Sequence, residues 1–326
     1  MLSKTNTLQV KGSAILMMII YHLWGCPQKY EAFHPNWYGH PITKALVLCV
    51  PIYLFLSGYG MQCGGVFDIK KMYKRISKLY ISFWLVFIPF VTLGTIIGYY
   101  HKPTSIYEFL NNFLGITYYY NAEWWFFCIY IGQLFAFIFL SRLKIKWYSY
   151  LGLMIAVFLV TRAILKTQVD LNFWFEMLLT YLNIFMLGCF FSKYDLFSDN
   201  LRMKNLNIFL KYTICVMMII VSIILRAYSP SVGVVELVSV PLFVWAVCNI
   251  SEIRSLGRLF VYFGKHSMNL WLLHSFFIFY YLNNLTFISY NPFVQLFLVV
   301  AQALICSIAI EYIKTKVSMI YYSNCK

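Results

Sequence analysis

The sequence predicts an all-α polytopic transmembrane bundle of about ten spans, with both termini in the cytoplasm. Three observations support this prediction. The 326 residues are 61% hydrophobic and only 11% charged, whereas soluble domains carry about 25% charged residues. The chain contains about ten apolar runs of the length needed to cross a bilayer, which is about 20 residues. Its Lys and Arg residues gather in alternate connections between these runs, as the positive-inside rule requires.

The expected spans follow one another without a long polar linker, so we expect one integral membrane domain over residues 1–326. The spans lie near residues 8–26, 42–63, 79–100, 123–140, 147–166, 174–192, 206–227, 233–250, 267–286 and 293–313. The first run is interpreted as a retained helix rather than a cleaved signal, because Trp24 fits a small-residue cleavage site poorly and many spans follow it.

The distribution of charge gives the orientation. With the N-terminus inside, twenty basic and five acidic residues fall inside, whereas six of each kind fall outside. The outer basic residues are Lys29, Lys44, Lys102, Arg162, Lys166 and Arg226. A basic inner face suits anionic lipid headgroups, and lipid alone is a sufficient explanation for it. It would also suit a phosphate-rich cytosolic ligand. The net charge of +15 does not indicate nucleic acid, because the basic residues lie between apolar spans.

The nine cysteines are scattered along the chain and form no CxxC motif. The sequence also lacks an HExxH motif and any Cys/His cluster. We therefore expect no metal site, and we interpret the cysteines as small buried hydrophobes.

Ionisable residues inside the expected spans are the first candidates for function, because charge is expensive in a bilayer. Lys11 and His22 are eleven residues apart, so they lie on one helix face about 16 Å apart along the axis. His274 lies about 13 Å inward from Lys265, at a depth close to that of His22. Snorkelling is the plain explanation for Lys11 alone, and a bonded packing histidine for His22 alone. Two imidazoles at one depth favour a function, because imidazole can act as base, acid or nucleophile.

The second span contains Ser57, Gly58, Tyr59 and Gly60. The two glycines permit close backbone approach. They predict either a helix-packing notch or a slot beside a ligand that is edged by Ser57 and Tyr59. A strongly basic segment that includes Lys74 and Arg75 follows.

The fourth span opens with Glu123 and Trp124. Tryptophan at a membrane boundary is usually part of an interfacial belt, but an acidic residue directly before it is less ordinary. Arg162 and other charged residues also lie at outer span ends. Mutual pairing would explain them, and the sharper hypothesis is that they converge on an outward cavity for a hydroxylated acceptor.

Five segments together resemble the membrane acyltransferase-3 family. They are Lys11-x10-His22, residues 55–59 (FLSGY), residues 74–76 (KRI), residues 123–126 (EWWF) and residues 263–274 (FGKHSMNLWLLH). Their order and spacing match over nearly the whole chain. There are departures: Lys11 replaces the commoner Arg and loses its bidentate fork, and Trp271 stands where Tyr is usual.

This resemblance implies a multi-pass O-acyltransferase of the bacterial cytoplasmic (inner) membrane. Its donor would be cytosolic acyl-CoA, commonly acetyl-CoA, without a metal, and its acceptor a hydroxyl of a surface polysaccharide or lipid-linked glycan. His22 is expected to be the general base or a transient acyl carrier, with Lys11 and His274 beside it. Oligomeric state and envelope-assembly partners are left open.

The other expected roles concern the two substrates. Lys74 and Arg75 would bind CoA phosphates, Ser57 and Tyr59 would line the pantetheine path, and Glu123, Trp124 and Arg162 would bind the acceptor. Two rival functions are a proton-coupled transporter that uses the histidines as a relay, and a scaffold subunit without chemistry.

Overall fold

The computed structural model describes residues 1–26, 38–65, 67–100, 105–167, 173–197, 206–229 and 233–324. These residues form helices and no strand, which confirms the predicted all-α class. The charge assignments of Lys29 and Lys102 lie outside the described residues. The helices are α1 (Lys4–Ile20), η1 (Tyr21–Gly25), α2 (Pro41–Ala45), η4 (Leu46–Leu48), α3 (Cys49–Cys63), α4 (Ile69–Ile96), α5 (Ile106–Phe113), η5 (Ala122–Trp125), α6 (Phe126–Leu140), α7 (Trp147–Lys166), α8 (Phe173–Lys193), α9 (Ile208–Tyr228), α10 (Glu236–Ile250), α11 (Arg254–Ile278), α12 (Asn283–Thr286) and α13 (Pro292–Asn324).

Seven of the helical segments are long and apolar enough to cross a membrane. They coincide with seven of the ten expected spans. The expected spans at 8–26, 233–250 and 267–286 coincide with α1 and η1, with α10 and with part of α11, which do not reach that length or apolarity. The number of spans and the positions of the termini therefore stay predictions.

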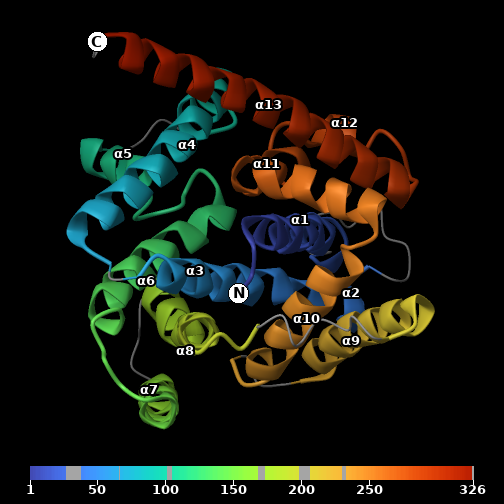
Figure 1. Ribbon diagram of the computed structural model, residues 1–326. Helices are drawn as coiled ribbons and strands as arrows, with labels where there is room; N and C mark the ends of the chain where they lie inside the picture. Colours follow the sequence, from blue (N-terminus) through green and yellow to red (C-terminus); the bar gives the residue numbers. More distant parts are fainter. Residues whose placement is uncertain are drawn as a thin grey trace.

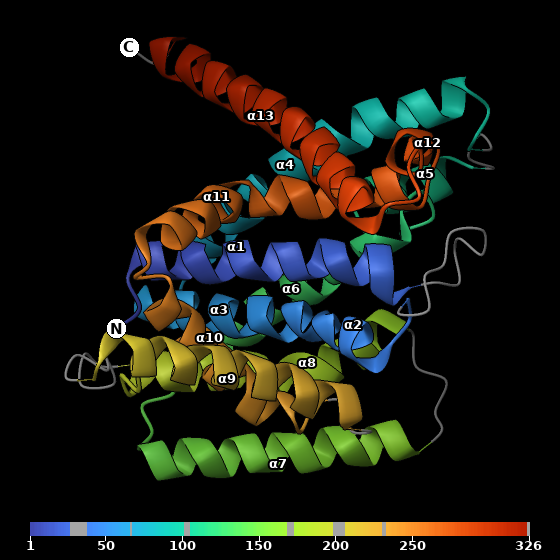
Figure 2. The same ribbon diagram turned by 90° about the vertical axis from the view of Figure 1, so that its right-hand side faces the viewer.

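Helix α1, which carries Lys11 and leads into His22, lies at the centre of the bundle. Figure 1 shows α11, α3 and α10 around it, and Figure 2 shows the helices stacked in layers with α13 at one edge and α7 at the other. Buried residues occur on all sides of α1, including Val10, Ala14, Ile15 and Met17. A helix that is enclosed by protein can carry Lys11 and His22 away from lipid, which is how a bilayer protein retains such residues.

The packing of α3 against α8 depends on glycine. A Cβ atom at Gly58 would overlap the carbonyl oxygen of Phe185, and one at Gly188 would overlap the carbonyl oxygen of Phe55. Small residues of this kind let membrane helices approach to backbone contact. Gly58 is therefore the packing notch of the second span, whereas a Cβ at Gly60 would meet nothing within 4 Å.

Helix α4 begins earlier than the expected third span. The helix starts at Ile69, ahead of the predicted span near residues 79–100, because the Asp68 side chain caps it by accepting a hydrogen bond of 2.8 Å from the Lys71 amide. The basic segment that includes Lys74 and Arg75 is therefore the first part of this helix.

Candidate active site

A close crossing of α1 and α11 sets the positions of the two histidines. A Cβ at Gly12 would overlap the Phe260 carbonyl, and a Cβ at Gly264 would overlap the Leu8 carbonyl. Each glycine lies ten residues before a histidine, since Gly12 precedes His22 and Gly264 precedes His274 by this number. Equal spacing along two adjacent helices that run in the same direction keeps the histidines in register.

The two imidazoles meet directly. His22 Nδ1 lies 2.8 Å from His274 Nε2, which agrees with the expected common depth. His22 belongs to a short π-helix, Tyr21–Gly25, and such single turns occur frequently at functional sites. Both residues are buried, His274 completely.

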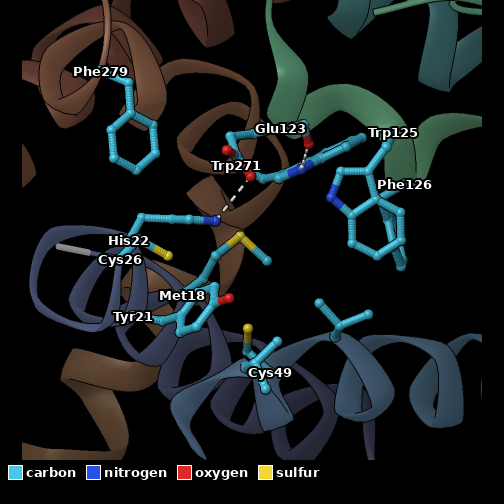
Figure 3. A pocket seen from close by; sticks show the side chains of 12 residues that line it. Met18, Tyr21, His22, Cys26, Cys49, Glu123, Trp125, Phe126, Trp271 and Phe279 are labelled. Carbon is cyan, nitrogen blue, oxygen red and sulfur yellow. Dashed lines mark hydrogen bonds and ion pairs between the residues drawn. The ribbon is translucent and has the colours of Figure 1, made fainter. Parts of the chain in front are cut away.

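The hydrogen bonds determine where the protons of this pair lie. His274 Nδ1 donates to the carbonyl oxygens of Trp271 at 2.8 Å and Leu270 at 3.1 Å, because a carbonyl can only accept. In the neutral imidazole, His274 Nε2 is then an acceptor, so His22 Nδ1 donates to it. The remaining nitrogen, His22 Nε2, lies 2.9 Å from Glu123 Oε2, as the dashed line in Figure 3 shows. One proton must lie between this nitrogen and this carboxylate.

Two tryptophans and an asparagine attach η5 to α11 and so hold Glu123 in place. Trp124 Nε1 donates to the Leu272 carbonyl at 3.1 Å, and Trp271 Nε1 donates to the Glu123 carbonyl at 3.2 Å. The Asn121 side chain accepts from the Glu123 amide at 3.0 Å and donates to Ser275 Oγ at 2.6 Å. Three of these contacts join the segment around Glu123 to α11, the helix that carries His274. The fourth fixes the backbone of Glu123 itself.

Three adjoining cavities lead to His22, whereas the fully buried His274 lines none of them. The histidine cavity has a volume of about 220 Å³ and is lined by His22, Glu123 and Met18 among others. The central cavity, of about 410 Å³, is lined by Lys11, Ser57 and Gly60 among others. The basic cavity, of about 350 Å³, is lined mainly by one end of α4. Neighbouring cavities share wall residues, so together they form a series that ends at His22.

Cations without carboxylate partners line this series. Lys11 faces the central cavity, Lys74 faces the basic cavity, and Arg75 and Lys78 face both. No Asp or Glu carboxylate among the described residues lies within ion-pair distance of these four side chains. An array of this kind favours a ligand with several negative charges.

The structure brings some predicted site residues together and leaves others apart. Lys11 and His22 line successive cavities that share Met18, which agrees with their expected common helix face. Ser57 lines the central cavity. Tyr59 lines none of the three cavities, and its hydroxyl accepts from the Leu2 amide at 2.9 Å.

The three predicted acceptor-binding residues do not lie in one cavity. Glu123 faces the histidine cavity, whereas Trp124 is buried behind it and lines none of the three cavities. The Arg162 guanidinium lies over the Phe158 ring at 5.3 Å, away from the three cavities. Arg226 pairs with the buried Glu236 at 3.1 Å, as mutual pairing of the outer charges predicts.

Sequence reasoning missed Asn121, Met18 and Lys78 as members of the site. A signal existed for each of them. An Asn two residues before Glu123 is typical of a side-chain cap, and Lys78 follows Arg75 at a helical spacing of three. Met18 also carries a signal, because it lies four residues before His22 and therefore on the same helix face, whereas Met17 does not.

A family model described as an acyltransferase domain matches residues 9–312. The chain belongs to the acyltransferase-3 family. No curated protein and no solved structure matches it in the other two comparisons. As an acyltransferase-3 protein with seven apolar helices of spanning length, it is a multi-pass membrane acyltransferase. The family assignment favours an acyltransferase over a transporter or a scaffold subunit.

Proposed function

We propose that this acyltransferase moves an acetyl or other short acyl group from cytosolic acyl-CoA to a hydroxyl of a surface polysaccharide or lipid-linked glycan. The observation that carries the proposal is the cavity series lined by cations, which ends at the His22–Glu123 pair. The enzyme would lie in the bacterial inner membrane, with the basic cavity facing the cytoplasm. No metal enters this mechanism.

The donor would occupy the series from its basic end. Coenzyme A carries a pyrophosphate and a 3′-phosphate, which Lys74, Arg75 and Lys78 would bind. The central cavity lies within the usual range of ligand pockets, about 300–1,000 Å³. It would hold the pantetheine arm, with Ser57 beside it and Lys11 as an additional cation. The thioester carbonyl would then approach His22.

The transfer itself needs one base. Before the step, His22 Nε2 releases to water the proton that it shares with Glu123, so that its lone pair is free. The acceptor oxygen then attacks the thioester carbonyl carbon, a C–O bond forms, and the hydroxyl proton passes to His22 Nε2. The C–S bond then breaks, and the proton goes to the departing sulfur, which gives the glycan ester and free CoA thiol. Glu123 would stabilise the imidazolium, while His274 holds the ring through His22 Nδ1. A transient acyl group on His22 Nε2 would use the same geometry.

Transfer of label from radioactive acetyl-CoA to glycan in inverted membrane vesicles tests the proposal. We expect label in the glycan fraction only when the chain is expressed. We also expect CoA without its 3′-phosphate to be a weaker competitor than CoA. Equal competition by pantetheine alone would contradict an anionic donor site, and absence of labelled glycan would contradict the proposed acceptor.

Neutralising two cavity cations tests the donor site. The double variant Arg75→Gln/Lys78→Gln is expected to raise the KM for acetyl-CoA at least about tenfold, because each lost charged contact is worth about 1.5–3 kcal/mol. The matched control is Arg142→Gln/Lys144→Gln, two cations that follow the end of α6 and line none of the three cavities. An equal rise in both double variants would mean that only overall charge matters.

Replacing Glu123 by Gln tests its support of the imidazolium. The amide keeps the shape and removes the charge, so we expect kcat to fall by about 10²-fold with little change in KM for the donor. Glu108→Gln, at an acid outside the cavities, should leave kcat unchanged. An unchanged kcat in Glu123→Gln would limit this carboxylate to a packing role.

A further inference from the structure

The histidine cavity and the central cavity are divided by a wall of three side chains. Among the described residues, only Met18, Phe126 and Trp271 line both cavities. An acyl group that travels from the central cavity to His22 must pass this wall. The wall therefore limits the size of the acyl group that can reach His22 Nε2. The side chain of the wall that is least held in place sets this limit.

Two members of the wall are held in place. The Trp271 indole donates to the Glu123 carbonyl, and the Phe126 ring packs edge-on against it, with 5.5 Å between ring centroids. Movement of Trp271 would break the contact that holds the Glu123 segment on α11. These two side chains therefore form the fixed part of the wall.

Met18 is the adaptable member. Its side chain is unbranched with three rotatable bonds, and the thioether can adjust to irregular space. It is 7% exposed, and Figure 3 shows it directed into the centre of the cavity beside His22 and Glu123. It lies four residues before His22, one helical turn toward the central cavity.

We propose that Met18 is the acyl-size filter of this enzyme. Its thioether occupies the passage past Phe126 and Trp271, admits an acetyl group to His22, and excludes longer acyl chains. This inference rests on the proposed use of acyl-CoA. Truncation of Met18 to Ala removes the side chain beyond Cβ, which is longer than the two carbons by which a butyryl group exceeds an acetyl group.

The test compares acetyl-CoA and butyryl-CoA as donors in inverted membrane vesicles, with kcat/KM measured for each. We expect Met18→Ala to shift the butyryl-to-acetyl ratio at least about tenfold toward butyryl, since a misfit of one methylene is worth about tenfold or more. Met18→Leu, which keeps the volume, should retain the acetyl preference. A ratio is insensitive to the amount of folded enzyme.

Met17→Ala is the matched control. Met17 is buried to the same degree on the same helix, at 8% exposed, but lines neither cavity. Its ratio should equal that of the wild type. As a second variant, Met18→Phe should block acetyl transfer while CoA binding, measured by calorimetry, is retained.

The outcomes separate the filter from the function. A wild-type enzyme that transfers acetyl, combined with an unchanged ratio in Met18→Ala or an equal shift in Met17→Ala, overturns the filter alone. Retained acetyl transfer in Met18→Phe does the same. A wild type that transfers from neither donor overturns the proposed function, and the filter with it.

Discussion

Replacement of His22 by Ala should lower acyl transfer by about 10²- to 10⁴-fold, the usual contribution of a positioned acid–base group. The loss is expected in kcat, because His22 would meet the reacting centre and not the phosphates of the donor. His22 Nε2 is the nitrogen paired with Glu123 in the histidine cavity, and its other nitrogen is held by His274. No other imidazole in the described residues lines that cavity.

The control for this variant is His266→Ala. His266 is on α11, where its Nδ1 bonds to Ser307 Oγ at 2.8 Å, and it lines none of the three cavities. Transfer should be near the wild-type rate in this control. Detection by immunoblot and size-exclusion chromatography should show similar amounts of both folded variants. Wild-type kcat in His22→Ala would exclude His22 as the base and as an acyl carrier.

The sequence predicts the chemistry of this site better than its walls. Ionisable residues in apolar runs are conspicuous, so Lys11, His22 and His274 can be chosen from the residue pattern alone. Their depth follows from the rise per residue. The partner of His22 is harder to predict, because Glu123 comes from a separate segment whose position depends on Asn121 and the two indole hydrogen bonds.

The directions of single side chains are less predictable. Ser57 and Tyr59 are two residues apart on one helix, so they point to different sides, and only Ser57 lines the central cavity. The π-helix around His22 leaves no local signal in the residues 21–25, YHLWG. The sequence groups Arg162 with Glu123 because both are expected near the outer membrane surface. Depth in the membrane does not specify which side of the bundle a helix occupies, so it cannot show that the two residues lie apart.

Gly264 offers the sharpest test of how the fold supports the site. Alanine in a helix is usually better than glycine by up to about 1 kcal/mol. At Gly264 we expect the opposite sign, because the added Cβ would overlap the Leu8 carbonyl of α1. Overpacking of this kind costs about 1–3 kcal/mol. Gly264→Ala should therefore lower the thermal unfolding temperature in detergent.

Gly264→Ala should also lower the rate of acyl transfer, by more than its loss of folded protein alone would explain. If α1 and α11 move apart, His22 and His274 separate, and a misplacement of about 1 Å can cost about 10²-fold in rate. Gly152→Ala on α7 is the matched control, since a Cβ there would meet nothing within 4 Å. It should preserve the rate and equal or exceed the wild-type stability. If the two variants behaved alike in both measurements, the glycine crossing could not be what keeps the histidines in register.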